Sequence, residues 1–315
     1  MNARVSGAVA GVALSVATVA GAPAALTHRA ETSLYVTVES HGIPVRGLTA
    51  ADFAVLQDGE PVAFRVAPAE QPAHVMVLVE NTVRARRFFE SDIQMALGSL
   101  SAIAADHDEY ALASFERRFA VTFGFGPNIG RLGRAYQRDV PQPIVGEPAL
   151  WDAMVEAVDR LDTLPGRRVL IVVTTGDDAS PQVTARVVRD RVRESNIVVF
   201  VCGVGTDLRM LLAPDVAASP RIPAGASEFE LRTLAVSTGG AAWFPPAHGV
   251  ADAMANLVRR IDDAYRIVYD PVLRPGAMLH PITVRAWRTS ATDLRTPLTV
   301  VAKDAWRVPL SESEE

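Results

Sequence analysis

Residues 74–84 read His-Val-Met-Val-Leu-Val-Glu-Asn-Thr-Val-Arg, and the rest of the chain is organised around this turn. The apolar run at 74–79 is typical of a β-strand that is buried on both faces of a parallel sheet. A helix-like segment follows over 86–103. In doubly wound α/β folds, a strand-to-helix turn of this kind lies at the carboxyl edge of the sheet, where ligands bind. The turn therefore predicts both a fold class and a candidate site.

Strands and helices alternate from residue 71 to residue 264. This alternation implies right-handed crossovers and a mostly parallel sheet. We therefore predict a doubly wound, Rossmann-like α/β domain with helices on the faces of the sheet. The expected strands are 74–79, 110–115, 119–123, 169–174, 198–204 and 241–244, and the expected helices are 86–103, 149–164, 184–194, 229–238 and 251–264.

The chain reads as β structure towards both of its ends, over 26–70 and 265–308. In the first part, Asp58-Gly59 is a hairpin signal between two short strands. Each part offers about three strands, which are too few to bury a hydrophobic core alone. We therefore predict that the two parts pack together as one small β domain beside the α/β domain at 71–264.

Residues 1–25 have the order of a secretory signal peptide. Arg4 gives a small positive region, 5–22 is apolar and uncharged, and 22–24 read Ala-Pro-Ala, a small-x-small cleavage site. The apolar part is rich in alanine and glycine, which makes a weak permanent membrane span. We predict cleavage, a mature chain that begins near Leu26, and a secreted or periplasmic location. An uncleaved anchor is the alternative.

The composition argues against several classes of protein. A net charge of −5 disfavours binding driven by nucleic-acid phosphates. Cys202 is the only cysteine, so an intramolecular disulfide is impossible, and its strand-like surroundings are typical of a buried hydrophobe. No G-x-S-x-G, H-E-x-x-H or P-loop motif occurs, so we expect no enzyme and no cofactor. The acidic residues at 309–315 are expected to form a disordered tail.

Four motifs follow one another between residues 47 and 284. They are G-L-T-A-A-D-F…D-G-E-P at 47–61, L-A-V-S-T-G-G at 234–240, Y-R-I-V-Y-D-P at 265–271 and H-P-I-T-V at 280–284. Together they resemble the landmarks of the von Willebrand factor A (VWA)-related domains that many bacteria secrete. The resemblance implies a VWA α/β core and a role in adhesion or complex scaffolding rather than catalysis, although a fold alone does not fix a function.

The resemblance also implies a metal-ion-dependent adhesion site (MIDAS), which binds Mg²⁺ or a similar ion through five side chains from three loops. Hard cations need a tight shell of oxygen ligands. The family has Asp, Ser, Ser, Thr and Asp where this chain has Glu80, Thr82, Arg84, Pro148 and Thr175. Pro148 offers no side-chain oxygen, and the guanidinium of Arg84 repels a cation. We therefore predict a degenerate site that binds no metal and in which Glu80 pairs with Arg84.

Three interpretations of this site are open from the sequence. In the first, this edge of the sheet has a structural role only and binds no ligand. Arg84 can bind a carboxylate of a partner protein directly, because it begins a helix and helix N-termini favour anions. A weak, shifted metal site can also form around Glu80. The auxiliary residues are Arg86 and Arg87 for the second interpretation, and Asp177 and Asp178 for the third.

The sequence thus favours a secreted protein-interaction or adhesion module that is not an enzyme. Its partner is an unknown protein, bound at Arg84 if the second interpretation holds. We expect no nucleic-acid binding and no stable membrane span after signal cleavage. The alternatives are a hydrolytic enzyme with an unrecognised site and a structural subunit of a cell-envelope complex.

Overall fold

The computed structural model places most of the chain between Thr27 and Arg307. The predicted signal peptide at 1–25 and the predicted tail at 309–315 lie outside the described residues. At 27–28, 87–91, 99–103, 226–227 and 273 the backbone alone is described. The described ranges are 27–28, 32–69, 72–103, 108–127, 130–143, 148–179, 182–203, 226–245, 249–273, 277–289 and 294–307.

A six-stranded sheet forms the centre of the molecule, in the order β12-β11-β10-β7-β8-β9. All neighbouring strands are parallel except β8 and β9. Numbered along this sheet alone, the order is the 3-2-1-4-5-6 order of doubly wound folds. The predicted α/β fold class is confirmed. The strands are β7 (Ala73–Glu80), β8 (Glu109–Phe115), β9 (Phe119–Gly126), β10 (Arg167–Thr174), β11 (Ile197–Gly203) and β12 (Ala242–Trp243).

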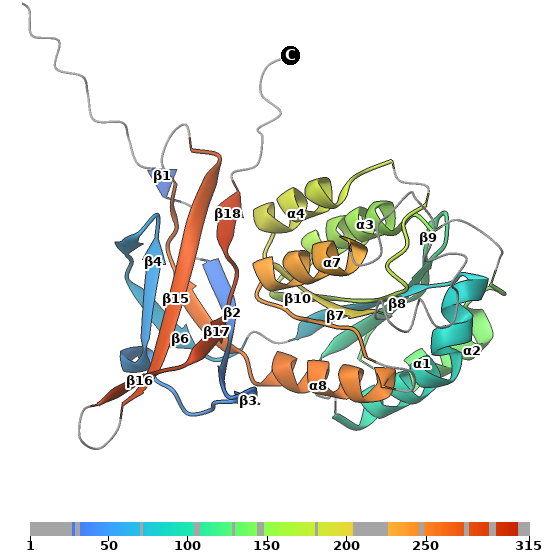
Figure 1. Ribbon diagram of the computed structural model, residues 1–315, viewed down its shortest axis with the longest axis horizontal. Coiled ribbons are helices and arrows are strands. Elements are labelled where there is room, and N and C mark those ends of the chain that lie inside the picture. The colour runs from blue at the N-terminus through green and yellow to red at the C-terminus, as the bar shows by residue number, and fades with distance from the viewer. Residues whose placement is uncertain are drawn as a thin grey trace, which may run out of the picture.

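Helices cover both faces of this sheet (Figure 1). Every residue of β7 is buried, because β7 lies inside the sheet with a hydrophobic cluster on each side. Among the described residues, no helix combines the length and the apolar character that a membrane span requires. One face carries α1 (Val83–Ile103), α2 (Gly130–Asp139) and α8 (Val250–Asp262), and the other carries α3 (Leu150–Asp162), α4 (Ala185–Glu194) and α7 (Ala226–Ser237).

The small β domain, which was part of the predicted fold class, is also confirmed. Two antiparallel sheets combine strands from both ends of the chain, in the orders β17-β2-β13-β6 and β16-β15-β4-β5, and they enclose a third hydrophobic cluster. Strand β3 also pairs with β2, β18 pairs with β15, and β1 pairs with β14. The early elements are β1 (Thr27–His28), β2 (Thr32–Ser40), β3 (Ile43–Pro44), η1 (Ala50–Asp52), β4 (Phe53–Gln57), β5 (Glu60–Pro61) and β6 (Phe64–Ala67). The late strands are β13 (Tyr265–Tyr269), β14 (Val272–Leu273), β15 (Leu279–Thr289), β16 (Arg295–Pro297), β17 (Thr299–Val301) and β18 (Ala305–Arg307).

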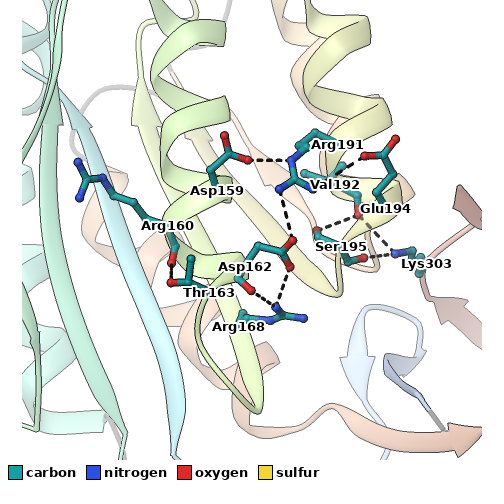
Figure 2. Close-up of polar contacts among 10 residues, drawn as sticks. All are labelled: Asp159, Arg160, Asp162, Thr163, Arg168, Arg191, Val192, Glu194, Ser195 and Lys303. Atoms are coloured by element: carbon teal, nitrogen blue, oxygen red, sulfur yellow. Dashed lines mark hydrogen bonds and ion pairs between the residues drawn. The ribbon is translucent and has the colours of Figure 1, made fainter. Parts of the chain in front are cut away.

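Lys303, the only lysine of the chain, joins the small β domain to helix α4. Its side chain is buried, and its ammonium donates to the carbonyl oxygens of Val192, at 3.3 Å, and of Ser195 (Figure 2). The same ammonium lies 3.5 Å from the ring centroid of Trp306. A cation at the end of a helix satisfies carbonyl groups that lack an intrahelical partner, so Lys303 holds the two parts of the molecule together.

Strand β2 makes two further charged contacts with the α/β domain. The guanidinium of Arg167, at the start of β10, lies 4.6 Å from the ring centroid of Tyr35. Arg260 on α8 forms an ion pair of 2.5 Å with Glu39. Arg167 is buried and the side chain of Arg260 is 20% exposed, so water and salt screen these contacts less than they screen ordinary surface pairs.

Candidate functional site

Glu80 ends β7 at the point where the sheet order reverses, next to the end of β10. Its side chain is 1% exposed. One carboxylate oxygen accepts a hydrogen bond of 2.7 Å from the Thr82 hydroxyl. The other accepts from the Thr174 hydroxyl at 2.8 Å, and from the backbone N–H and the hydroxyl of Thr175 at 2.7 and 2.8 Å. Four donors therefore bind the carboxyl group of Glu80, three of them at one oxygen.

The two loops that surround Glu80 are fixed by local turn chemistry. The Thr82 hydroxyl accepts from the N–H of Ala85 at 3.1 Å, and so it caps the first turn of α1. After β10, the N–H of Gly176 donates to the Thr174 hydroxyl at 2.9 Å. Gly176 has a φ of 77°, a conformation that glycine adopts without steric cost. The hydroxyls that bind Glu80 are therefore held in place before any ligand arrives.

The predicted ion pair between Glu80 and Arg84 is wrong. Arg84 forms its ion pair with Asp177, in the loop after β10. Glu80 receives its hydrogen bonds from threonines and from the backbone. The two side chains differ in depth, because the Glu80 carboxyl group is buried, whereas the Arg84 side chain is 37% exposed.

Asp178 and Pro148 join the second and third loops. The carboxylate of Asp178 accepts from the N–H of Leu150 at 2.8 Å, which caps α3. The carbonyl of Pro148 accepts from the N–H of Ala179 at 2.9 Å. Burial raises the pKa of Asp178 to about 6, against the lowering effect of its backbone hydrogen bonds. The hydrogen bond of Asp178 thus has a structural role in this loop.

Of the two auxiliary arginines, Arg86 is the one whose side-chain contacts the structure describes. Arg86 donates to the side-chain oxygen of Asn81 at 3.1 Å and to the carbonyl of Pro141 at 3.3 Å. Its guanidinium also lies 4.9 Å from the ring centroid of Tyr136 on α2. These contacts direct Arg86 towards α2, away from Asp177. The side chain of Arg87 lies outside the described residues.

Three of the five MIDAS positions come together in the structure. The hydroxyls of Thr82 and Thr175 both donate to the carboxylate of Glu80. Within the described part of the chain, no three His, Cys, Asp or Glu side chains are grouped as a metal site requires. Sequence reasoning missed Thr174, although the Thr174-Thr175 pair directly after a buried strand is a signal that could have identified it.

Three solved structures show what this chain resembles. An aerotolerance-related membrane protein from Bacteroides fragilis is 15% identical, with 60% of this chain and 98% of that chain covered and a TM-score of 0.44. PTMP1 from the mussel byssus, with a zinc-occupied MIDAS motif, is 15% identical, with 66% and 50% covered and a TM-score of 0.48. The ArnB paralog VWA2 from Sulfolobus acidocaldarius is 11% identical, with 88% and 76% covered and a TM-score of 0.40.

Its structural neighbours are VWA-domain proteins. The chain spans about half the length of the mussel protein. No protein-family model and no curated protein matches the sequence. Because these TM-scores are below 0.5, the fold assignment rests on the chain's own sheet order, which is that of a doubly wound domain.

Proposed function

We propose that this VWA-like chain is an exported protein-interaction module without enzymatic activity, and that its MIDAS position is closed by internal contacts in place of a metal ion. The observation that carries the proposal is the set of four donors on the Glu80 carboxylate. A cation bound by the Glu80 carboxylate would have to displace hydrogen bonds from this set.

The charge of Arg84 opposes a cation as well. Two like unit charges about 4 Å apart repel by roughly 4 kcal/mol at an effective dielectric of 20, and a divalent ion doubles that energy. The carboxylate of Asp177 offsets the charge of Arg84 from inside the chain. A carboxylate from a partner protein can take the same place only by displacing Asp177, so we propose that this ion pair is the point at which a partner would engage the site.

The test is calorimetric titration of the purified protein with Mg²⁺ and Mn²⁺. We expect no saturable binding at micromolar to millimolar concentrations for the natural sequence. The double variant Arg84→Ser with Thr175→Asp restores a hydroxyl and a carboxylate, and we expect it to bind more tightly than the natural sequence, with Pro148 limiting the gain.

Glu80→Ala is the control for the titration. Micromolar binding by the natural sequence that this variant abolishes would show that the site holds a metal, and the proposal would then be wrong. A parallel screen with generic ester, peptide and phosphate substrates tests the absence of enzymatic activity, and turnover of any one of them would contradict it.

A further inference from the structure

Helix α2 carries a row of arginines on its outer side. Arg131, Arg134 and Arg138 are exposed, and their spacing places them on one face of the helix. The opposite face, which includes Leu132 and Tyr136, is buried in the hydrophobic cluster on that side of the sheet. Helix α2 lies beside α1, at the end of the α/β domain away from the small β domain (Figure 1). Its outer surface is therefore basic and presents no apolar side chain.

The positive charges of this arginine row are only partly neutralised within the chain. Arg138 pairs with its neighbour Asp139 at 2.6 Å, and the Arg138 side chain remains 78% exposed. In the part of the chain that the structure describes, Arg131 and Arg134 form no ion pair. Asp139 is the only acidic residue of α2. Two positive charges of the row thus face solvent uncompensated, although the whole chain has a net charge of −5.

The arginine row ends beside the MIDAS position. Just after α2, the carbonyl oxygen of Pro141 accepts from the side-chain amide of Asn81 at 3.1 Å and from Arg86 at 3.3 Å. These two residues belong to the turn that follows β7, in which Arg84 is 37% exposed. The C-terminal end of the row and the arginine of the MIDAS position therefore lie at the same edge of the central sheet.

The surface of α2 fits a protein better than a membrane. Helices that bind bilayers insert an apolar face beside their basic one. The apolar face of α2 packs against its own sheet, so a bilayer would meet charged and polar side chains alone.

A second copy of this chain offers little that matches the arginine row. Helix α3 has acidic residues at a comparable helical spacing, Asp152, Glu156 and Asp159. Asp152 accepts from the N–H of Gln182 at 2.9 Å, and Asp159 pairs with Arg191 at 2.7 Å. Among the described residues only Glu156 of these three lacks such a contact. A different protein with a run of free carboxylates complements the row better.

We propose that the arginine row of α2 binds an acidic segment of the partner protein. One carboxylate of the segment reaches Arg84, and the following ones pair with Arg134 and Arg131. The inference rests on the proposed function in one respect, the engagement of Arg84, and it adds the class of partner and the path of the segment along α2. Charge complementarity of this kind steers association and fixes the register of the partner, and salt weakens it.

Two labelled peptides of twelve residues test the proposal. One alternates glutamate with serine, and the other alternates glutamine with serine. Fluorescence anisotropy measures their binding to the purified protein in the presence of EDTA, so that no metal ion contributes. We expect saturable binding of the glutamate peptide, at least about tenfold tighter than that of the glutamine peptide, because several ion pairs act together. Added salt should weaken this binding.

The double variant Arg131→Gln with Arg134→Gln removes the two uncompensated charges and keeps a helix former at both positions. We expect it to weaken binding of the glutamate peptide at least about fivefold. Arg285→Gln with Arg288→Gln is the matched control. Both are exposed arginines of β15 without an ion pair among the described residues, and they lie on opposite faces of their strand, so they form no row. The control variant should bind as the natural sequence does.

The variant Arg84→Gln separates this inference from the proposed function. We expect it to weaken binding as well. Loss of binding in the α2 variant alone supports the arginine row and contradicts the engagement of Arg84. Loss in Arg84→Gln alone overturns the arginine row and leaves the engagement of Arg84 standing.

Three further results overturn the proposal. The first is the absence of saturable binding of the glutamate peptide, or an equal loss in the control variant on β15. The second is binding to vesicles of equal parts phosphatidylglycerol and phosphatidylcholine that is tighter than binding of the peptide and is lost in the α2 variant. The third is a dimer in solution that the α2 variant dissociates, because a second copy would then occupy the row.

Discussion

At Glu80, four hydrogen bonds from within the chain converge on one buried carboxyl group. From its ordered motifs the sequence located the loops of Glu80, Thr82 and Thr175, which the structure brings together. It did not predict that Arg84 turns to Asp177, since that choice depends on the relative depth of two side chains and on the course of the loop after β10.

Asp178 predicts how stability changes with pH. Its pKa is raised to about 6 in the folded chain by burial, from an ordinary value of 3.8. The folded state then binds a proton more tightly than the unfolded state, so this residue lowers stability as pH rises from about 4 to about 6. Asp178→Asn keeps an acceptor for the N–H of Leu150 and removes the titration. After allowance for solvent screening near the loop, the titration of Asp178 changes the free energy of unfolding by about 1–2 kcal/mol.

Urea unfolding of the natural sequence and of Asp178→Asn between pH 4 and pH 7 measures this effect. We expect the free energy of unfolding of the natural sequence, minus that of the variant, to rise by about 1–2 kcal/mol as pH falls from 7 to 4. Other titrating groups are common to both chains and cancel in the difference. A difference that does not vary with pH would contradict the assignment.

At the scale of elements, buried strands were the most predictable part of the fold. Continuous apolar runs such as 74–79 and 169–174 fall inside β7 and β10. Helix α2 was not predicted, because Gly130 and Gly133 lower helix propensity. It forms nonetheless, since Leu132, Ala135 and Tyr136 are buried against the sheet. Tertiary packing overrode local propensity in that segment.

The Gly-Gly pair that ends the motif at 234–240 has a steric explanation. A methyl group added at Gly240 would lie 1.9 Å from the carbonyl oxygen of Val199, a backbone atom that cannot move aside. We expect Gly240→Ala to destabilise the fold by at least about 3 kcal/mol. Gly124→Ala, where a methyl group meets nothing within 4 Å, is the matched control and should change stability by less than about 1 kcal/mol. Chemical unfolding measures the loss of stability in each variant. Similar losses in the two variants would show that the backbone contact at Gly240 relaxes.

At the scale of the whole molecule, the chain begins and ends its described part in the same small β domain. Strand β13 lies between β2 and β6, so a C-terminal strand completes a sheet whose other members come mostly from the N-terminal part. The small number of strands in each segment indicated that neither could bury a core alone. The contacts of Lys303 with α4 could not be predicted, because they depend on how the two domains are placed relative to one another.

This arrangement predicts what a truncation before β13 will do. A chain that ends at Ala264 retains β6 but loses β13, with which Arg65 pairs through Val268. We expect trypsin to cleave after Arg65 at least about tenfold faster than in the full chain, because an unpaired strand opens far more often than a paired one. A chain that ends at Arg307 is the control and should retain the protection of the full chain. Cleavage after Arg168 in β10 reports on the α/β core in each sample. If Arg65 stays protected in the chain that ends at Ala264, the N-terminal strands fold without the C-terminal ones.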